Sequence, residues 1–186
     1  TAPLDLEAMA TLQAALKRGI EMTFQIEESE LVAEPLPKQD ERQALLFYEA
    51  AEGGAAVLTR LATEPQAMAQ VAAAALRVMH YADPKGPWSV DDLPALENKT
   101  PDGHSVCEAG CYQCLLSYFN QPDHDHINRR NAQAIEMLVA LANAQVAPVS
   151  VATEPTGPSA PLPATQAGGA LFTSWQQALL AGGFQP

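Results

Sequence analysis

Three cysteines lie within eight residues of this chain, and the rest of the sequence contains none. They run from Cys107 to Cys114 with the spacing C-x3-C-x2-C, so that two residues separate Cys111 from Cys114. A Cys-x-x-Cys turn can bring two thiolates onto one tetrahedral metal ion with little backbone strain. The cluster therefore predicts a structural zinc site that takes three ligands from this loop and needs one more.

The fourth ligand must be another nitrogen or sulfur, and with no cysteine left a histidine is the natural source. We expect it to be His124, because the bend Asn120-Gln-Pro-Asp123 can fold the chain back onto the cluster. The predicted zinc ligands are Cys107, Cys111, Cys114 and His124. The alternatives are the other three histidines, His80, His104 and His126, or a ligand from a partner or water.

Two other interpretations of the cysteines compete with a metal site. A disulfide framework is disfavoured, because an odd count cannot pair within one chain and the first residues lack a basic-then-apolar signal segment. We therefore expect a reducing, cytoplasmic setting. Three buried free thiols are the remaining alternative, although packing alone seldom produces spacing this tight.

The charge balance limits the partners that this chain can bind by itself. Lysine and arginine number 10 against 22 acidic residues, a net charge of -12. Phosphate contacts are made chiefly by lysine and arginine, so free-standing nucleic-acid binding is disfavoured and any contact must be local. The candidate contacts are two adjacent basic pairs, Lys17 with Arg18 and Arg129 with Arg130, for which solvated helix ends are the alternative. No apolar run approaches the roughly 20 residues that a membrane helix needs, so no membrane partner is expected.

Hydrophobic periodicity predicts an α+β fold, an α-rich domain stabilised by zinc with a small antiparallel sheet. Gly19 is expected to end the first helix, and a capping box at 63–66 to start the third. Trp88 is the expected anchor of the long loop 83–103. The predicted helices span about 5–18, 55–62, 66–80, 112–120 and 127–144, and the predicted strands 22–32 and 44–49.

Composition divides the chain into three predicted parts. Residues 1–147 carry the periodic segments and the cysteines, and 148–171 form a linker rich in proline, alanine and glycine. Residues 172–186 have the pattern of one short amphipathic helix, which would not be stable alone and therefore suggests the start of a further domain or a docking element.

The segment around the cysteines resembles a known family. Its motif is Cys-Tyr-Gln-Cys-Leu-Leu-Ser-Tyr-Phe-Asn-Gln over 111–121, followed by His124 and Ile127-Asn-Arg129. Two further stretches, 12–30 and 47–54, are similar to the same family, so the resemblance covers about residues 5 to 145. That family is the zinc-binding C-terminal domain of bacterial superfamily-two (DEAD/DEAH-type) helicases, as in MrfA-like repair helicases and in DISARM and Druantia phage-defence proteins. Two positions depart from it: Ser105 stands where relatives have a fourth cysteine, and Ala56 where many have a third glycine after Gly53-Gly54.

The resemblance implies a structural zinc-binding accessory domain of a larger ATP-dependent DNA helicase or translocase, in phage defence or DNA repair. Its implied partners are a helicase motor domain or subunit, and DNA through that assembly. These residues contain neither a Walker motif nor a convincing catalytic centre, so ATP and Mg²⁺ are expected only in a motor outside them. Two other functions are the alternatives. One is a protein-interaction module without nucleic-acid contact, which the acidity favours, and the other is a zinc hydrolase or deaminase that uses Glu108.

Overall fold

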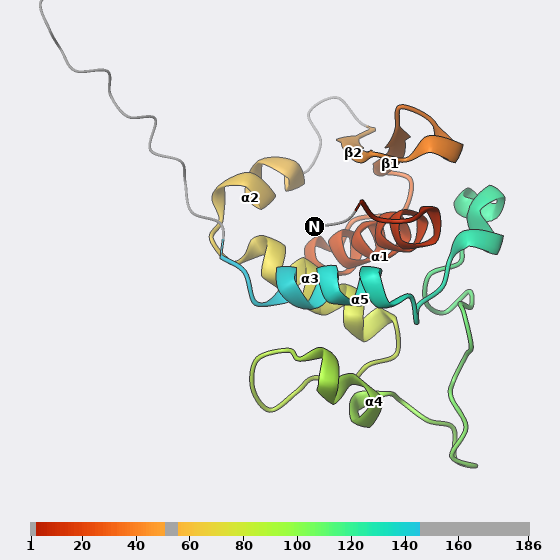
Figure 1. Cartoon of the computed structure of the whole chain (residues 1–186). Helices are drawn as coiled ribbons and strands as arrows, with labels where there is room; N and C mark the ends of the chain where they lie inside the picture. Colours follow the sequence, from red (N-terminus) through yellow and green to blue (C-terminus); the bar gives the residue numbers. More distant parts are fainter. Residues whose placement is uncertain (1–2, 51–55, 146–186) are drawn as a thin grey trace, which may run out of the picture. The chain divides into compact units, whose positions relative to one another are not determined.

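The computed structural model describes residues 3–50 and 56–145 of the chain (Figure 1). Its α-helices and strands, in chain order, are α1 (Leu6–Phe24), β1 (Leu31–Leu36), β2 (Ala44–Glu49), α2 (Val57–Thr63), α3 (Ala67–Val78), α4 (Leu93–Leu96) and α5 (Ala132–Ala142). Short 3-10 segments are η1 (Gln39–Glu41), η2 (Val90–Asp92) and η3 (Tyr118–His126). The α+β prediction is confirmed, with a two-stranded antiparallel sheet beside the helices.

Helix α1 is longer than its sequence pattern predicted. Asp5 caps it by accepting a hydrogen bond from the Ala8 N–H at 2.6 Å, and it ends at Gln25, whose φ of 55° is left-handed. The predicted strand over 22–32 was wrong except at its last two residues: Phe24 ends the helix, and with Ile26 it packs against the small core cluster beside α2. The alternation of apolar and polar residues over this stretch therefore belongs to a helix end and a turn, whose apolar side chains pack on a second apolar cluster.

Gly19 does not end α1, as the sequence suggested, but lies inside it where α1 crosses α3. A Cβ atom at this position would lie 2.4 Å from the carbonyl oxygen of Val71 and 3.1 Å from the Ala75 Cβ. The glycine thus lets the two helix backbones approach closely, which explains why a poor helix former occupies a helix interior.

Gly19→Ala is expected to destabilise the chain by about 1–3 kcal/mol, because the added methyl group meets backbone that cannot yield as a side chain would. The midpoint of urea unfolding should fall, with an unchanged dependence on denaturant concentration. Gly86→Ala is the matched control, since a Cβ there has nothing within 4 Å. Equal stability of the two variants would contradict the close-approach explanation.

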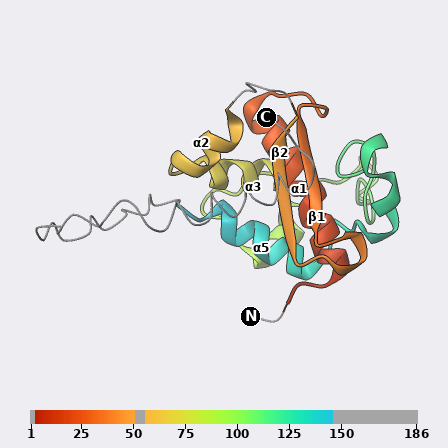
Figure 2. The ribbon, with the colours of Figure 1, turned by 90° about the horizontal axis from the view of Figure 1, so that it is seen from above.

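The two strands form a hairpin that lies along α1 (Figure 2). Leu31 pairs with Glu49 and Leu36 with Ala44, so the predicted second strand is confirmed and the first strand begins at Leu31. Leu31 is buried against Ile20 and Val71, whereas Leu46 is exposed on the other face. Because one face of this hairpin rests on α1, the sheet does not need to be stable alone.

The main core lies between α1, α3 and α5, which pack against one another. Small alanines on α1 and α3 allow close packing, while larger side chains such as Leu12, Leu76 and Leu138 bury more apolar area per residue. Trp88 is the loop anchor that the sequence predicted: its backbone exchanges hydrogen bonds of 3.0 and 2.8 Å with the Asn143 side chain, just after α5. The loop before the cysteines is thereby fastened to the last helix.

Three further helix predictions need adjustment. The capping box at 63–66 is absent, because the Thr63 hydroxyl donates to the Thr59 carbonyl oxygen and no side chain caps α3. The helix expected over 112–120 is a turn followed by η3. The last helix starts only at Ala132, after Asn131 caps it by accepting from the Ala134 N–H.

Other predictions fall on residues that the structure does not describe. These are the Gly53-Gly54 turn, the linker over 148–171 and the helix over 172–186. Within 3–50 and 56–145, every helix is too short or too polar to cross a membrane.

Candidate metal centre

The first side chain of the site follows directly after α3. His80 has a φ of 68°, in the left-handed region that residues other than glycine seldom adopt. Its N–H donates to the Arg77 carbonyl at 3.0 Å, and the Tyr81 N–H donates to the Leu76 carbonyl at 3.1 Å. This is the Schellman pattern that ends many helices, with histidine where glycine is usual. The helix end therefore turns the imidazole out of the helical direction at some conformational cost.

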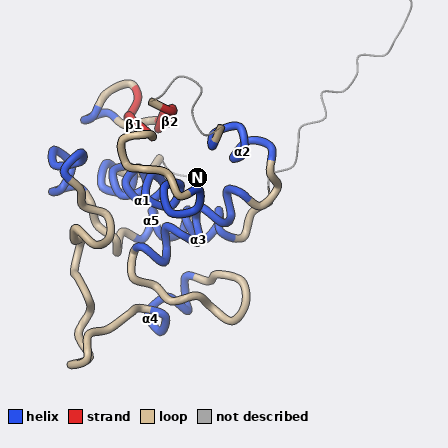
Figure 3. Tube along the Cα trace, turned by 180° about the vertical axis from the view of Figure 1, so that it is seen from behind, coloured by secondary structure: helices blue, strands red, loops and turns tan. Residues whose placement is uncertain are grey.

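The cysteine loop lies in the long connection between α3 and α5, which is largely without regular structure (Figure 3). The Cys114 N–H donates to the Cys111 carbonyl at 3.0 Å, and the Cys111 N–H donates to the Cys114 sulfur at 3.0 Å. The Leu116 N–H also donates to the Cys111 carbonyl, at 3.1 Å. Cys114 and Leu115 are fully buried in the main core, so the turn is fixed to the helices that surround it.

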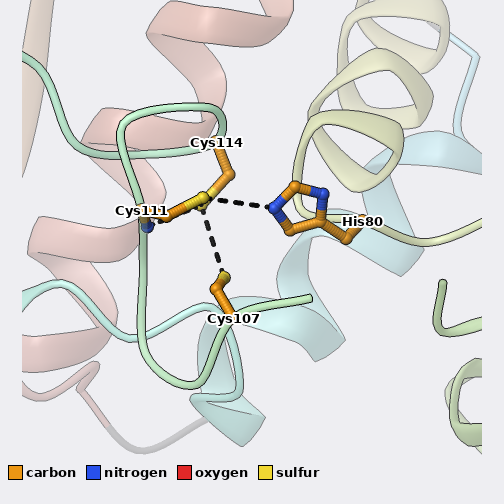
Figure 4. A group of neighbouring side chains, drawn as sticks. All are labelled: His80, Cys107, Cys111 and Cys114. Atoms are coloured by element: carbon orange, nitrogen blue, oxygen red, sulfur yellow. Dashed lines mark hydrogen bonds between the residues drawn. The ribbon is translucent and has the colours of Figure 1, made fainter. Parts of the chain in front are cut away.

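These segments bring His80, Cys107, Cys111 and Cys114 together, with their ligand atoms all within 4.8 Å of one another (Figure 4). The Cys107 and Cys114 sulfurs are 3.8 Å apart, the Cys111 and Cys114 sulfurs 3.5 Å, and His80 Nε2 lies 3.4 Å from the Cys111 sulfur. A tetrahedral zinc with ordinary bond lengths requires S–S separations of about 3.8 Å and N–S separations of about 3.6 Å. The four side chains thus fit a Cys3His zinc site, and the shell needs no large movement to accept the ion.

The surroundings determine the charge of each donor without metal. Burial raises the pKa of Cys114 to about 12 and also raises the pKa of Cys107. For Cys111, burial is outweighed by hydrogen bonds from Cys114 and the nearby backbone, which lower its pKa. Burial, together with the positive charge of Arg129, lowers the pKa of His80, so that its ring is neutral and able to ligate at neutral pH. Zinc binding must therefore displace protons from at least Cys107 and Cys114, as thiolate ligation requires.

A comparison with protein families matches residues 12–115 to the MrfA Zn-binding domain. The match spans more than half of the 186 residues and includes all four side chains of the site. The chain belongs to the MrfA zinc-binding domain family. No curated protein and no solved structure matches it. The resemblance seen in the sequence is thereby confirmed, and the MrfA-family match ends before His124.

The structure does not bring His124 to the cysteines. Its Nε2 lies 3.0 Å from both the Ser117 carbonyl oxygen and Asn120 Oδ1, and its ring packs edge-on against Tyr112. His104 and His126 also lie outside the Cys3His group. We therefore replace His124 with His80 as the candidate fourth ligand. The bend from Asn120 to Asp123 places His124 against the Ser117 carbonyl and the Asn120 side chain, and not at the metal site.

The sequence placed His80 among the alternative ligands, but His124 was preferred because it lies much closer to the cysteines in the chain. Residues 81–106 separate His80 from Cys107 in the sequence, so the two become neighbours only when the chain folds. One signal was available. The family resemblance implies a fourth cysteine at the position of Ser105, and the Ser105 hydroxyl here accepts from Arg130 at 2.6 Å. If one thiolate is missing, another segment must supply the fourth donor atom, and the chain just after α3 is such a segment.

The four basic residues predicted to contact nucleic acid are all engaged by acidic groups. Lys17 and Arg18 both pair with Glu21, at 2.6 and 3.0 Å. Arg130 pairs with Glu108 at 2.7 Å and with Glu97 at 3.2 Å. Arg129 has no exposed surface, so in this conformation it cannot reach a phosphate. Of the adjacent pair, Arg129 faces the core and Arg130 the surface, and nucleic-acid contact by these basic residues stays a prediction.

Proposed function

We propose that this chain is a structural zinc-binding accessory domain of a larger ATP-dependent DNA helicase or translocase, acting in DNA repair or phage defence. The observation that carries the proposal is the Cys3His group, whose spacing fits tetrahedral zinc, within a match to the MrfA Zn-binding domain. In this proposal His80, Cys107, Cys111 and Cys114 hold the ion. Zinc cross-links the end of α3 to the loop that precedes η3 and α5.

The donor set supports a structural site over a catalytic one. Four protein ligands complete a tetrahedron and leave no position for a reactive water, whereas catalytic zinc keeps one open. Glu108, the candidate base for a hydrolase or deaminase, has a side chain 84% exposed and paired with Arg130. Cys114 lies fully buried in the main core, where zinc would add to the packing of the helices.

The helicase context rests on the family resemblance around the cysteines and on the name of the matched family. The sequence lacks the phosphate-binding motifs of a motor, so ATP hydrolysis belongs to another part of the assembly. The domain's contribution would be a rigid surface offered to that motor, and DNA would be handled by the assembly as a whole.

The charge distribution favours a second candidate, a module that docks a partner protein without touching nucleic acid. Arg129 is buried, and Lys17, Arg18 and Arg130 are all paired with carboxylates. With a net charge of -12, approach of a polyanion to most of this surface is unfavourable.

The assembly that contains this chain allows the two candidates to be compared. With Cys111→Ser, DNA-stimulated ATP hydrolysis should fall at least 10-fold while hydrolysis without DNA persists, because a disordered domain no longer couples DNA to the motor. Lys85→Ser is the control. Unchanged DNA stimulation in the Cys111 variant would contradict the accessory role. Lost subunit association with normal DNA affinity, in the same variant and in Arg130→Glu, would instead favour the docking module.

A further inference from the structure

Arg129 is a buried cation whose contacts all lie around the metal centre. Its side chain has no exposed surface, and all three guanidinium nitrogens donate hydrogen bonds to protein oxygens. Nε and Nη2 donate to the Cys107 carbonyl oxygen at 3.0 and 2.8 Å, and Nη1 donates to the Met79 carbonyl oxygen at 3.1 Å. Nη2 also pairs with the Glu97 carboxylate. A buried charge is tolerated only with such complete compensation, so this position is specific for its partners.

The partners of Arg129 belong to the segments that carry the candidate ligands. Cys107 is itself a candidate ligand, and Met79 immediately precedes His80. The backbone N–H of Arg129 donates to the Ala109 carbonyl at 2.7 Å, which gives the cysteine loop a second attachment to this residue. On the other side, the Asn98 N–H, next to Glu97, donates to the His80 carbonyl at 2.8 Å. One guanidinium therefore joins the end of α3, the segment 97–98 and the start of the cysteine loop.

We infer that Arg129 is a positioning residue for the metal centre, which holds the backbone on both sides of the site so that His80 and Cys107 are spaced for one ion before it binds. The inference rests on the proposed zinc site and adds to it the residue that assembles it. Without this link fewer contacts hold the two segments at the spacing that one ion requires. Metal binding would then have to order the two segments as well, and it would become less favourable because loop ordering costs conformational entropy.

The shape of the guanidinium explains why arginine is needed. Its planar fork directs several N–H groups at once, here toward two carbonyl oxygens and a carboxylate. A lysine keeps the positive charge but is a single point donor that cannot span the Met79 and Cys107 carbonyls in this way. Arg129→Lys therefore tests the geometry of the contact separately from its charge.

The test measures zinc affinity of the full 186-residue chain by competition with a chromogenic chelator, under reducing conditions. Arg129→Lys should bind zinc about 10–100-fold more weakly than the wild type, the usual cost of removing a group that orients metal ligands. Arg130→Lys is the matched control, because Arg130 is its chain neighbour, is 41% exposed and contacts no carbonyl of a ligand segment. Glu97→Gln should give a smaller loss than Arg129→Lys, since it leaves both carbonyl contacts of the guanidinium in place and keeps a side-chain oxygen that can accept from it.

A purely structural role for Arg129 makes a different prediction. If the role is purely structural, Arg129→Lys should lower the urea midpoint by the same amount with and without zinc. If Arg129 positions the ligands, the substitution should mainly reduce the rise in midpoint that zinc binding produces. Wild-type affinity in Arg129→Lys, or an equal loss in Arg130→Lys, would overturn the inference. If Arg129→Lys does not fold, Glu97→Gln decides it by the same two measurements. Failure of the wild type to bind zinc would overturn the proposed site itself, and this stoichiometry is measured first.

Discussion

Replacing Cys111 with serine is expected to abolish stoichiometric zinc binding and to unfold the region around the cysteine loop. Structural zinc contributes an apparent 10–16 kcal/mol, roughly, in small zinc-finger peptides at neutral pH, which is comparable to the whole stability of a typical domain. The Cys111 sulfur lies 3.5 Å from the Cys114 sulfur and 3.4 Å from His80 Nε2, so the substitution removes a donor that lies close to two of the other three. Elemental analysis should give about one zinc per wild-type chain and well below that in the variant, with lost helical circular dichroism or protease resistance.

The identity of the fourth ligand is decided by a pair of histidine variants. His80→Asn removes the ring while asparagine tolerates the left-handed backbone at this position, so a loss of zinc can be assigned to the ligand and not to the turn. His80→Cys should retain zinc through four thiolates. His124→Ala is the comparison: it should keep its zinc and lose about 1–3 kcal/mol from its broken hydrogen bonds. Zinc retained in His80→Asn and lost in His124→Ala would restore the ligand set expected from the sequence.

Asp123→Ala is expected to lower the free energy of unfolding by about 3–5 kcal/mol, because it leaves a buried arginine without its counter-charge. Arg42, between η1 and β2, has no exposed side-chain surface and pairs with Asp123 in η3, whose side chain is 11% exposed. Gln39 donates to the same carboxylate oxygen at 2.7 Å. The pair therefore fastens the strand hairpin to the segment that follows the cysteine loop. Urea unfolding of the zinc-loaded chain measures the effect.

Two variants serve as controls for this ion pair. Asp123→Asn keeps an oxygen that can accept from Arg42, so it should destabilise the chain less than Asp123→Ala. Glu41→Ala removes an exposed pair with Lys38, in which the side chains are 61% and 60% exposed, and should cost at most about 1 kcal/mol. Equal losses in Asp123→Ala and Glu41→Ala would mean that burial does not strengthen the Arg42–Asp123 contact.

Local patterns were reliable where one element determines its own conformation. The returning strand over 44–49 and the helical stripe of Ile135 and Leu138 are confirmed. Element ends were less predictable, as Gly19 illustrates. A glycine near the end of an apolar stripe is typical of a helix stop, but here the approach of α3 determines its role. That approach involves residues from Val71 to Ala75, which no local window around Gly19 contains.

The sequence by itself determined the α+β class, the family and three of the four candidate metal ligands, because the cysteines are neighbours in the chain and their spacing carries the geometry. Only the tertiary structure decided the fourth donor and the function of Arg129. The packing of α3 and the cysteine turn in one core brings His80 to the thiols, whereas His124 contacts the Ser117 carbonyl and the Asn120 side chain. Arg129 and Arg130 are alike in sequence, yet one is buried and one exposed, because the chain there runs along the edge of the core. Packing determines the contacts between segments that are far apart in sequence, and a local sequence pattern does not predict them.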